Sequence, residues 1–224
     1  MKHLTFYYDC ISPYAWLAFE RLPETLLGLS YGVTYKPILF AALLQQHGQL
    51  GPAEIAPKRD WTYRQVAWLG HSLGVPLQFP ATHPFNPLPL LRLAVACGDA
   101  QGATNRYVTE AVLRHVWSSD GADALDPARL QALSLQLAPR WDPADAAVKA
   151  RLKANTDEAI ALGLFGVPTV VVDDAPDKRF WGFDALPMLR DYLQGGAWFQ
   201  SGAWEAMARV PVGVQRVAPR ASGS

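Results

Sequence analysis

The sequence contains few cysteines, no long apolar run and no excess of either charge. Cys10 and Cys97 are too few for a disulfide framework in 224 residues, so a reducing cytoplasm is the default location. No run of about eighteen apolar residues exists, which argues against a membrane-spanning helix. Twenty basic and twenty acidic residues cancel. Electrostatics therefore gives no reason to expect binding to nucleic acid or to an anionic membrane surface.

Motifs for common cofactors and for export are missing as well. The five histidines show no metal-ligand spacing, and no metal site is expected. Gly195-Gly196 follows a predicted helix rather than a strand, which argues against a phosphate-binding loop. The apolar N-terminal run is interrupted by Asp9, Ser12 and Pro13, and no cleavage site follows it. A signal peptide is therefore not expected.

Half of the residues are hydrophobic, so the chain can bury a core without cross-links. Alternating aromatic and β-branched residues predict a strand over residues 3–8. Ser12 followed by Pro13 is a helix-start signal, with the serine as N-cap, and predicts a helix over 13–27. The stretch YGVTYKPIL (31–39) predicts a second strand, which completes a β-α-β unit.

From about residue 40 to 163 the pattern is helical. Helices are predicted over 59–73, 87–97 and 104–118, and the Asp-Pro pairs at 126–127 and 142–143 mark two further helix starts.

The β pattern returns near the end of the chain. GLFGVPTVVVDD (163–174) predicts a strand, RFWGF (179–183) predicts its hairpin partner, and Asp184 is expected to cap a last helix that ends near Gln194. The predicted order is β-α-β, a helical block, then β-β-α. These strands are too few for two sheets, so one α/β sheet built from both ends of the chain is expected.

This arrangement resembles the thioredoxin fold with a large all-helical insertion. The stretches FYYDCISPYAWLA, PKRDWTYRQVAWLGHSLGVPLQFPATHPFNPLPLLRLA and FGVPTVVVDD with FWGFDAL resemble, in this order, the 2-hydroxychromene-2-carboxylate isomerase family. That family is related to kappa-class glutathione transferases and to DsbA-type oxidoreductases. The resemblance covers about residues 3–194. The expected domains are a thioredoxin-like one from 1–39 and 164–195, an inserted helical one over 40–163, and a C-terminal extension over 196–224 with a disordered end.

Ser12 stands where a redox Cys-x-x-Cys pair would have its first cysteine, and Ala15 stands in the place of the second. Without either sulfur, dithiol exchange at this turn is excluded. A hydroxyl at a helix N-terminus can donate a hydrogen bond to a thiolate, because the free N–H groups and the helix dipole favour negative charge there. Lowering a thiol pKa by about two units takes ~2.7 kcal/mol and makes most of the thiol nucleophilic. The resemblance implies that Ser12 does this for glutathione, while its plain role is the N-cap.

The resemblance also implies a cis peptide bond at Val167-Pro168, although most X–Pro bonds in folded proteins are trans. The Val167 backbone N–H and C=O would then be unpaired and free to bind the extended tripeptide like an additional strand. The plain alternative is a proline that starts a strand.

Three polar residues complete the implied glutathione site. Asp184 would bind the γ-glutamyl amino group, and its plain role is a helix cap. Lys58 would contact a carboxylate of glutathione or of an acidic substrate, and by default it is a solvated cation. Gln49 lies near a family asparagine. Glutamine in place of asparagine departs from the family pattern. The longer amide can make the same hydrogen bonds, but from a displaced position.

Other residues near these motifs have weaker interpretations. Cys10 is expected to be an inert buried thiol. His83 and Asn86, in ATHPFNPL, either line the substrate side or belong to a proline-rich loop packed on the sheet. The aromatic segment 196–207 packs either on the main body or on a partner chain.

By resemblance the chain is expected to be a glutathione-dependent isomerase of aromatic degradation. It would interconvert 2-hydroxychromene-2-carboxylate and trans-o-hydroxybenzylidenepyruvate. Addition of the glutathione thiolate would make the conjugated double bond temporarily single, rotation would follow, and elimination would return the thiol. The implied cofactor is glutathione, the partner a small aromatic carboxylate, and the assembly a cytoplasmic homodimer. A kappa-like glutathione transferase and a non-catalytic thioredoxin-fold binding protein remain alternatives.

Overall fold

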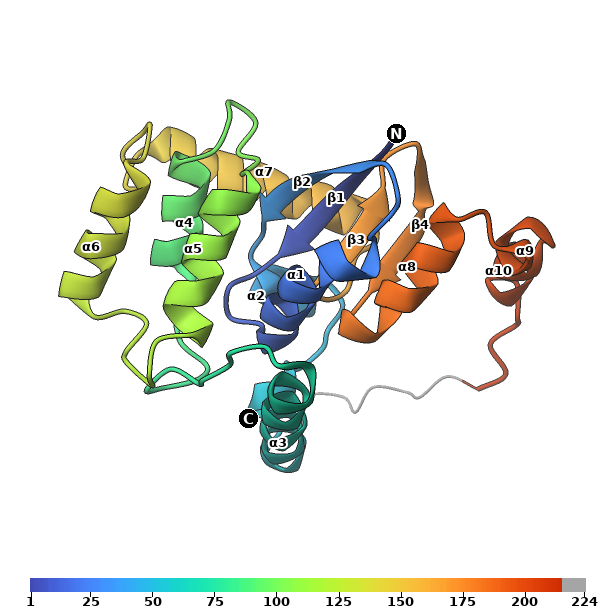
Figure 1. Cartoon of the computed structure of the whole chain (residues 1–224), viewed down its shortest axis with the longest axis horizontal. Coiled ribbons are helices and arrows are strands. Elements are labelled where there is room, and N and C mark those ends of the chain that lie inside the picture. The colour runs from blue at the N-terminus through green and yellow to red at the C-terminus, as the bar shows by residue number, and fades with distance from the viewer. Residues whose placement is uncertain (215–224) are drawn as a thin grey trace, which may run out of the picture.

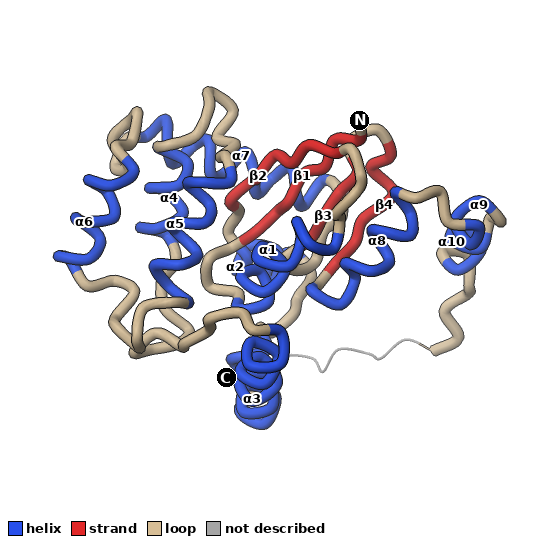
Figure 2. The backbone as a smooth tube through the Cα atoms, viewed as in Figure 1, coloured by secondary structure: helices blue, strands red, loops and turns tan. Residues whose placement is uncertain are grey.

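The computed structural model describes residues 1–214, and its centre is a four-stranded sheet of order β2-β1-β3-β4. The strands are β1 (Lys2–Tyr8), β2 (Tyr31–Pro37), β3 (Thr169–Val172) and β4 (Ala175–Trp181). β1 and β2 are parallel, whereas β3 is antiparallel to both β1 and β4. Figure 2 shows that the two ends of the chain contribute strands to this one sheet, as the sequence predicts.

The helices surround the sheet and extend beyond its β2 edge (Figure 1). They are α1 (Pro13–Thr25), α2 (Phe40–Gln46), α3 (Ala56–Leu73), α4 (Leu88–Ala96), α5 (Arg106–Trp117), α6 (Pro127–Leu137), α7 (Ala146–Ala161), α8 (Leu186–Leu193), α9 (Ala197–Gln200) and α10 (Ala203–Met207), with 3-10 turns η1 (Pro52–Glu54) and η2 (Phe183–Ala185). The elements α2 to α7 lie between β2 and β3 in the chain, where the sequence predicts a helical block.

Both faces of the sheet are covered, which leaves the central strand β1 without contact to water over most of its length. Phe6 and Tyr8 face a large buried cluster that includes residues of α1, α4, α5 and α8. Tyr7 faces the opposite side and packs with Leu43 of α2 and Ala159 of α7. Figure 1 shows α1 and α8 in front of the sheet and α7 behind it. Two helices of the inserted block therefore form part of the sheet's second layer.

Several of the predicted element boundaries are wrong; the hairpin strand predicted over 179–183, for example, is β4, which begins four residues earlier, at Ala175. The strand predicted over 163–174 is shorter in the structure, where it covers only Thr169–Val172 (β3). It cannot begin earlier, because Gly163 has a positive φ and Pro168 has no N–H to pair with a neighbouring strand. The helix start predicted at 142–143 is displaced to Ala146. The Asp142 side chain instead accepts a hydrogen bond from Ala144 N at 2.8 Å, which closes a turn ahead of α7.

The C-terminal extension packs on the main body through aromatic contacts. The rings of Phe199 and Trp204 lie 6.0 and 5.9 Å from the ring of Phe180 on β4. Lys178 of β4 also binds the Glu205 carboxylate of α10 at 2.9 Å. The disordered end expected for the extension falls on residues 215–224, outside the described part of the chain.

Within residues 1–214, no helix is long and apolar enough to cross a membrane.

Candidate active site

The turn between β1 and α1 is built around a buried carboxylate. Asp9 is fully buried; its Oδ1 accepts a hydrogen bond from Ile11 N at 3.0 Å, and its Oδ2 accepts one from Phe40 N at 2.9 Å. One side chain thus ties this turn to the start of α2, at the carboxyl ends of two parallel strands. Burial raises the pKa of Asp9 to about 7.

Ser12 is the N-cap of α1, as the sequence predicts. Its backbone is extended (φ −91°, ψ 116°), and its Oγ accepts a hydrogen bond from Ala15 N at 3.3 Å. The Ser12 hydroxyl donates a hydrogen bond to the Val167 carbonyl over a long 3.4 Å, and the residue is 8% exposed. In the described chain, the Tyr14 N–H in the first turn has no hydrogen-bond acceptor. The turn therefore presents a loosely engaged hydroxyl and a free N–H group at the positive end of a helix.

The Val167-Pro168 peptide bond is cis, which confirms the expectation from the resemblance. The expectation that both backbone groups of Val167 are unpaired is only half correct, because its carbonyl accepts the Ser12 hydroxyl. The Val167 N–H makes no hydrogen bond within residues 1–214. An extended peptide bound along this segment would find this N–H free to donate a hydrogen bond.

Asp184 is exposed and does not cap the last helix, so its predicted cap role is wrong. It lies inside the 3-10 turn η2, and α8 begins after Ala185 with no side-chain cap. Burial, and to a smaller extent the negative charge of Asp184, raise the pKa of Tyr14, two residues beyond Ser12. The structure thus places this exposed residue near the start of α1.

Lys58 and Gln49 are also exposed, and their side chains make no hydrogen bond or ion pair within residues 1–214. The segments that carry them nevertheless border the site. His47 Nε2 lies 3.0 Å from the Leu164 carbonyl, which holds the segment before Gln49 beside the loop that leads to Pro168. The assignments of Lys58, Gln49 and Asp184 to glutathione binding stay predictions.

α3, which carries Lys58, is joined to the turn by a polar contact. The Tyr14 hydroxyl donates to Gln65 Oε1 at 2.7 Å.

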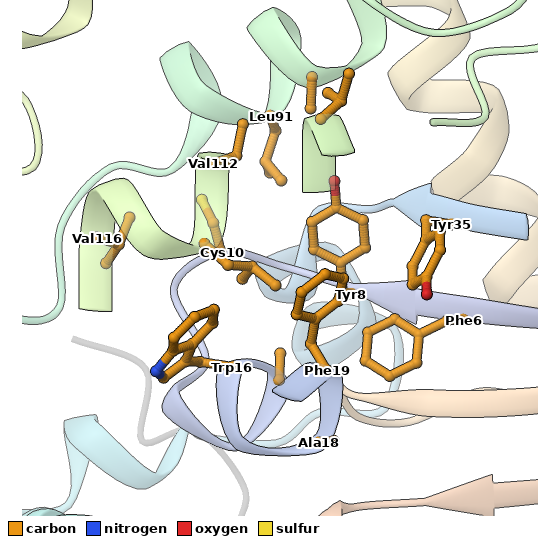
Figure 3. Close-up of a cluster of buried hydrophobic side chains, with 14 of the residues drawn as sticks. Phe6, Tyr8, Cys10, Trp16, Ala18, Phe19, Tyr35, Leu91, Val112 and Val116 are labelled. Carbon is orange, nitrogen blue, oxygen red and sulfur yellow. The ribbon is translucent and has the colours of Figure 1, made fainter. Parts of the chain in front are cut away.

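Cys10 is completely buried, as predicted. Figure 3 shows its sulfur directed into the core toward Val112. Burial raises the pKa of its thiol well above the usual range, so the thiol stays neutral. Its carbonyl accepts a hydrogen bond from Trp117 Nε1 at 2.9 Å.

The proline-rich loop of His83 and Asn86 supports the turn. His83 Nε2 lies 2.8 Å from the Ile11 carbonyl, and the Tyr63 hydroxyl lies 2.6 Å from His83 Nδ1. Asn86 Oδ1 accepts a hydrogen bond from Leu88 N at 3.1 Å and so binds the first N–H group of α4. Sequence reasoning identified His83 without its partner and missed Asp9, Tyr14, Tyr63, Gln65 and Trp117, because the contacts that matter join distant parts of the chain.

A groove of about 440 Å³ lies away from Ser12, between β4 and the C-terminal extension. Its aromatic lining includes Phe165, Trp181 and Trp198. Within residues 1–214, no group of three or more His, Cys, Asp or Glu side chains is arranged to hold a metal ion.

Comparison with known proteins identifies related chains over most of this length. A family model described as a DSBA-like thioredoxin domain matches residues 3–194. The chain is 29% identical over 200 residues to 2-hydroxychromene-2-carboxylate isomerase of Sphingobium xenophagum, covering 86% of this chain and 98% of that one. It is 24% identical over 208 residues to glutathione S-transferase kappa 1 of Rattus norvegicus, covering 87% and 92%.

The fold is similar to a solved structure of 2-hydroxychromene-2-carboxylate isomerase, with a TM-score of 0.69 and 23% identity over 90% of this chain and 98% of that one. The predicted resemblance and the thioredoxin-like α/β fold with a helical insertion are therefore confirmed.

Proposed function

The chain belongs to the family of DSBA-like thioredoxin domains, and on that premise we propose that it is a glutathione-dependent isomerase. The proposed substrate is 2-hydroxychromene-2-carboxylate or a related intermediate of aromatic degradation. The matched relatives are enzymes named as isomerase and glutathione transferase.

The observation that carries the proposal is the environment of Ser12. A hydroxyl replaces the sulfur at the N-terminus of α1, and it faces the backbone of Val167 just before a cis-proline. Ala15 provides no second sulfur, and Cys10 is buried and turned away. This turn retains the field of a helix end without a redox pair of its own, so a reactive thiol has to come from a ligand.

The residues present fit glutathione in charge and hydrogen-bonding capacity. The Ser12 hydroxyl and the Tyr14 N–H are donors for a thiolate, and the Val167 N–H is a donor for a peptide carbonyl. The exposed Asp184 carboxylate suits an ammonium group, and the Lys58 ammonium suits a carboxylate. When bound, glutathione supplies the thiol whose reversible addition lets a conjugated double bond rotate. Ser12 then holds negative charge on that sulfur and lowers the cost of ionising it.

The direct test follows isomerisation of 2-hydroxychromene-2-carboxylate by absorbance, with and without added glutathione. We expect turnover that depends on glutathione although glutathione is not consumed. Turnover that is the same without glutathione would contradict the proposal.

A kappa-like transferase is the second candidate, because the similarity to glutathione S-transferase kappa 1 extends over 87% of the chain. It would use the same glutathione site to conjugate electrophiles. Glutathione binding without isomerisation, together with consumption of glutathione by an electrophile, would favour this candidate. A homodimeric assembly and the cytoplasmic location remain part of the proposal.

A further inference from the structure

His83 lies in the loop between α3 and α4, and its imidazole is surrounded by aromatic rings. The ring centroids of Tyr63, Phe79, Phe85 and Trp117 lie 5.3, 6.0, 6.2 and 5.5 Å from that of His83. The side chain is half-buried and has no acidic partner in the described chain. Burial lowers the pKa of His83, so the neutral imidazole is favoured at neutral pH.

The two contacts of this imidazole determine its tautomer. Nε2 lies 2.8 Å from the Ile11 carbonyl, which can only accept, so Nε2 carries the proton. Nδ1 of a neutral ring is then an acceptor, and the Tyr63 hydroxyl at 2.6 Å donates to it. The same hydroxyl also lies 2.9 Å from the His83 carbonyl, so its single proton is shared between two acceptors, and the shorter contact to Nδ1 is the stronger one. Tyr63 thus fixes the ring in the tautomer that can bind Ile11.

The peptide groups just before Ser12 are bound by one side chain of the turn itself and by two side chains from distant parts of the chain. Asp9 holds the Ile11 N–H, Trp117 of α5 holds the Cys10 carbonyl, and His83 holds the Ile11 carbonyl. The Ile11 carbonyl belongs to the peptide unit that contains the Ser12 nitrogen. A change in its direction therefore rotates the residue whose hydroxyl faces the site.

Tyr63 also connects this arrangement to α3. Of the eighteen residues of α3, Val66 and Gly70 are buried, and Figure 1 shows the helix projecting from the body of the molecule. Its polar links to the turn are the Tyr63–His83 contact and the contact between Gln65 and Tyr14. α3 packs on the core through Val66, Leu69 and Leu73, and these polar links add to the apolar contacts that orient the helix relative to Ser12.

We propose that His83 is a positioning residue for the Ser12 turn. Through the Ile11 carbonyl it fixes the direction of the Ser12 hydroxyl and of the neighbouring N–H groups, and through Tyr63 it aligns α3 with the same turn. The consequence is a lower pKa for the thiol of bound glutathione. This inference rests on the proposed function and assigns a specific task to a residue outside the implied glutathione contacts.

The test measures the thiol pKa of bound glutathione from the ultraviolet absorbance of the thiolate as a function of pH. Affinity for S-methylglutathione, which has no ionisable thiol, is measured alongside and reports on the rest of the site. In His83→Leu we expect the thiol pKa of bound glutathione to rise by about one unit relative to the wild-type protein. At a pH well below both pKa values, the thiolate fraction would then be about tenfold lower. The Kd for S-methylglutathione should stay within about twofold, because the change acts on the charged sulfur.

Three further variants separate positioning from general stability. His83→Gln keeps a donor for the Ile11 carbonyl and should recover most of the shift. Tyr63→Phe removes the hydroxyl that fixes the tautomer and should raise the thiol pKa by a smaller amount. His115→Leu is the matched control, since His115 is also half-buried, has a pKa lowered by burial and lies 3.0 Å from a backbone carbonyl, that of Ala124. It should leave the thiol pKa unchanged.

An unchanged thiol pKa in a folded His83→Leu variant that binds S-methylglutathione normally would overturn the inference. If His83→Leu does not fold, Tyr63→Phe decides by the same criterion. An equal shift in His115→Leu would also overturn it, because the effect would then reflect stability. Failure of the wild-type protein to bind glutathione would instead refute the proposed function, and this inference with it.

Discussion

The turn that carries Ser12 and the rim that carries Lys58, Gln49 and Asp184 differ sharply in how they are held. At the turn, each of the three residues before Ser12 takes part in a side-chain hydrogen bond. The Asp9 carboxylate accepts from the Ile11 N–H, and the carbonyls of Cys10 and Ile11 are bound by Trp117 and His83. At the rim, the three polar side chains are exposed and make no hydrogen bond or ion pair within the described chain. The centre of the candidate site is preorganised, whereas its periphery is free to adapt.

The difference indicates a division of labour between chemistry and recognition. Buried donors keep their direction and act in a medium of low dielectric constant, which strengthens their effect on a charged sulfur. Exposed charges are screened by water, and each contributes little to binding. Changes at the turn should therefore alter stability and turnover, and changes at the rim should alter affinity by small factors.

The largest expected effect concerns Asp9 and the stability of the turn. Its pKa is raised to about 7 in the fold, so the folded state binds a proton that the unfolded chain has already lost above pH 4. Stability is thus expected to fall by up to about 4 kcal/mol as the pH rises from about 4 to 7. Urea unfolding across this range should show a shallower pH dependence in Asp9→Asn. Equal pH dependence in both proteins would show that this carboxylate does not titrate as a buried group.

Ser12→Ala should give the next largest effect, now on turnover. Loss of a preorganised donor to a developing negative charge costs about 100-fold in kcat. It also removes a helix cap, which costs about 1 kcal/mol of stability. Asp126→Ala is the matched control, because Asp126 caps α6 through Arg129 N at 2.9 Å. A comparable drop in kcat in both variants would assign the loss to capping alone.

Asp184→Asn should have a smaller effect, confined to affinity. Removing this exposed carboxylate is expected to weaken glutathione binding about fivefold and to leave kcat at saturating glutathione unchanged. Isothermal titration calorimetry gives the Kd, and Asp145→Asn is the control, since Asp145 is also exposed and its side chain does not cap α7. A large fall in kcat would break the distinction between centre and rim.

Lys58→Met and Gln49→Ala should have the smallest effects. Lys58→Met is expected to weaken glutathione binding about threefold at low salt, with the difference shrinking as salt increases. Lys149→Met removes an exposed lysine on α7 and should change nothing. Gln49→Ala is expected to change the Kd by no more than about twofold. A tenfold loss in either variant would mean that the rim closes tightly around the ligand.

The sequence predicted the features that local chemistry determines. Ser12 next to Pro13 specified the cap and the start of α1, and the alternating residues 3–8 and the β-branched run near residue 170 located β1 and β3. The expected cap at Asp184 failed because the chain forms a 3-10 turn after Gly182, whose φ is +93°, so the regular helix begins later. A cap signal is reliable only when the next residues are already helical.

The supports of the turn could not be predicted, because they depend on contacts between distant residues. Trp117 and Cys10 are 107 residues apart, and His83 and Ile11 are 72 apart. No local pattern brings these pairs together; the packing of α5 and of the proline-rich loop against the turn does. The same holds for Asp9, which looked like an interruption of a strand and proved to be fully buried.

The most direct test of the central claim is the thiol pKa of glutathione bound to the wild-type protein and to Ser12→Ala. If Ser12 and the N-terminus of α1 stabilise a thiolate, the bound thiol should titrate about two units below free glutathione, and most of this shift should disappear in Ser12→Ala. A bound thiol that titrates like free glutathione, or a lowered pKa that survives the loss of the Ser12 hydroxyl, would contradict it.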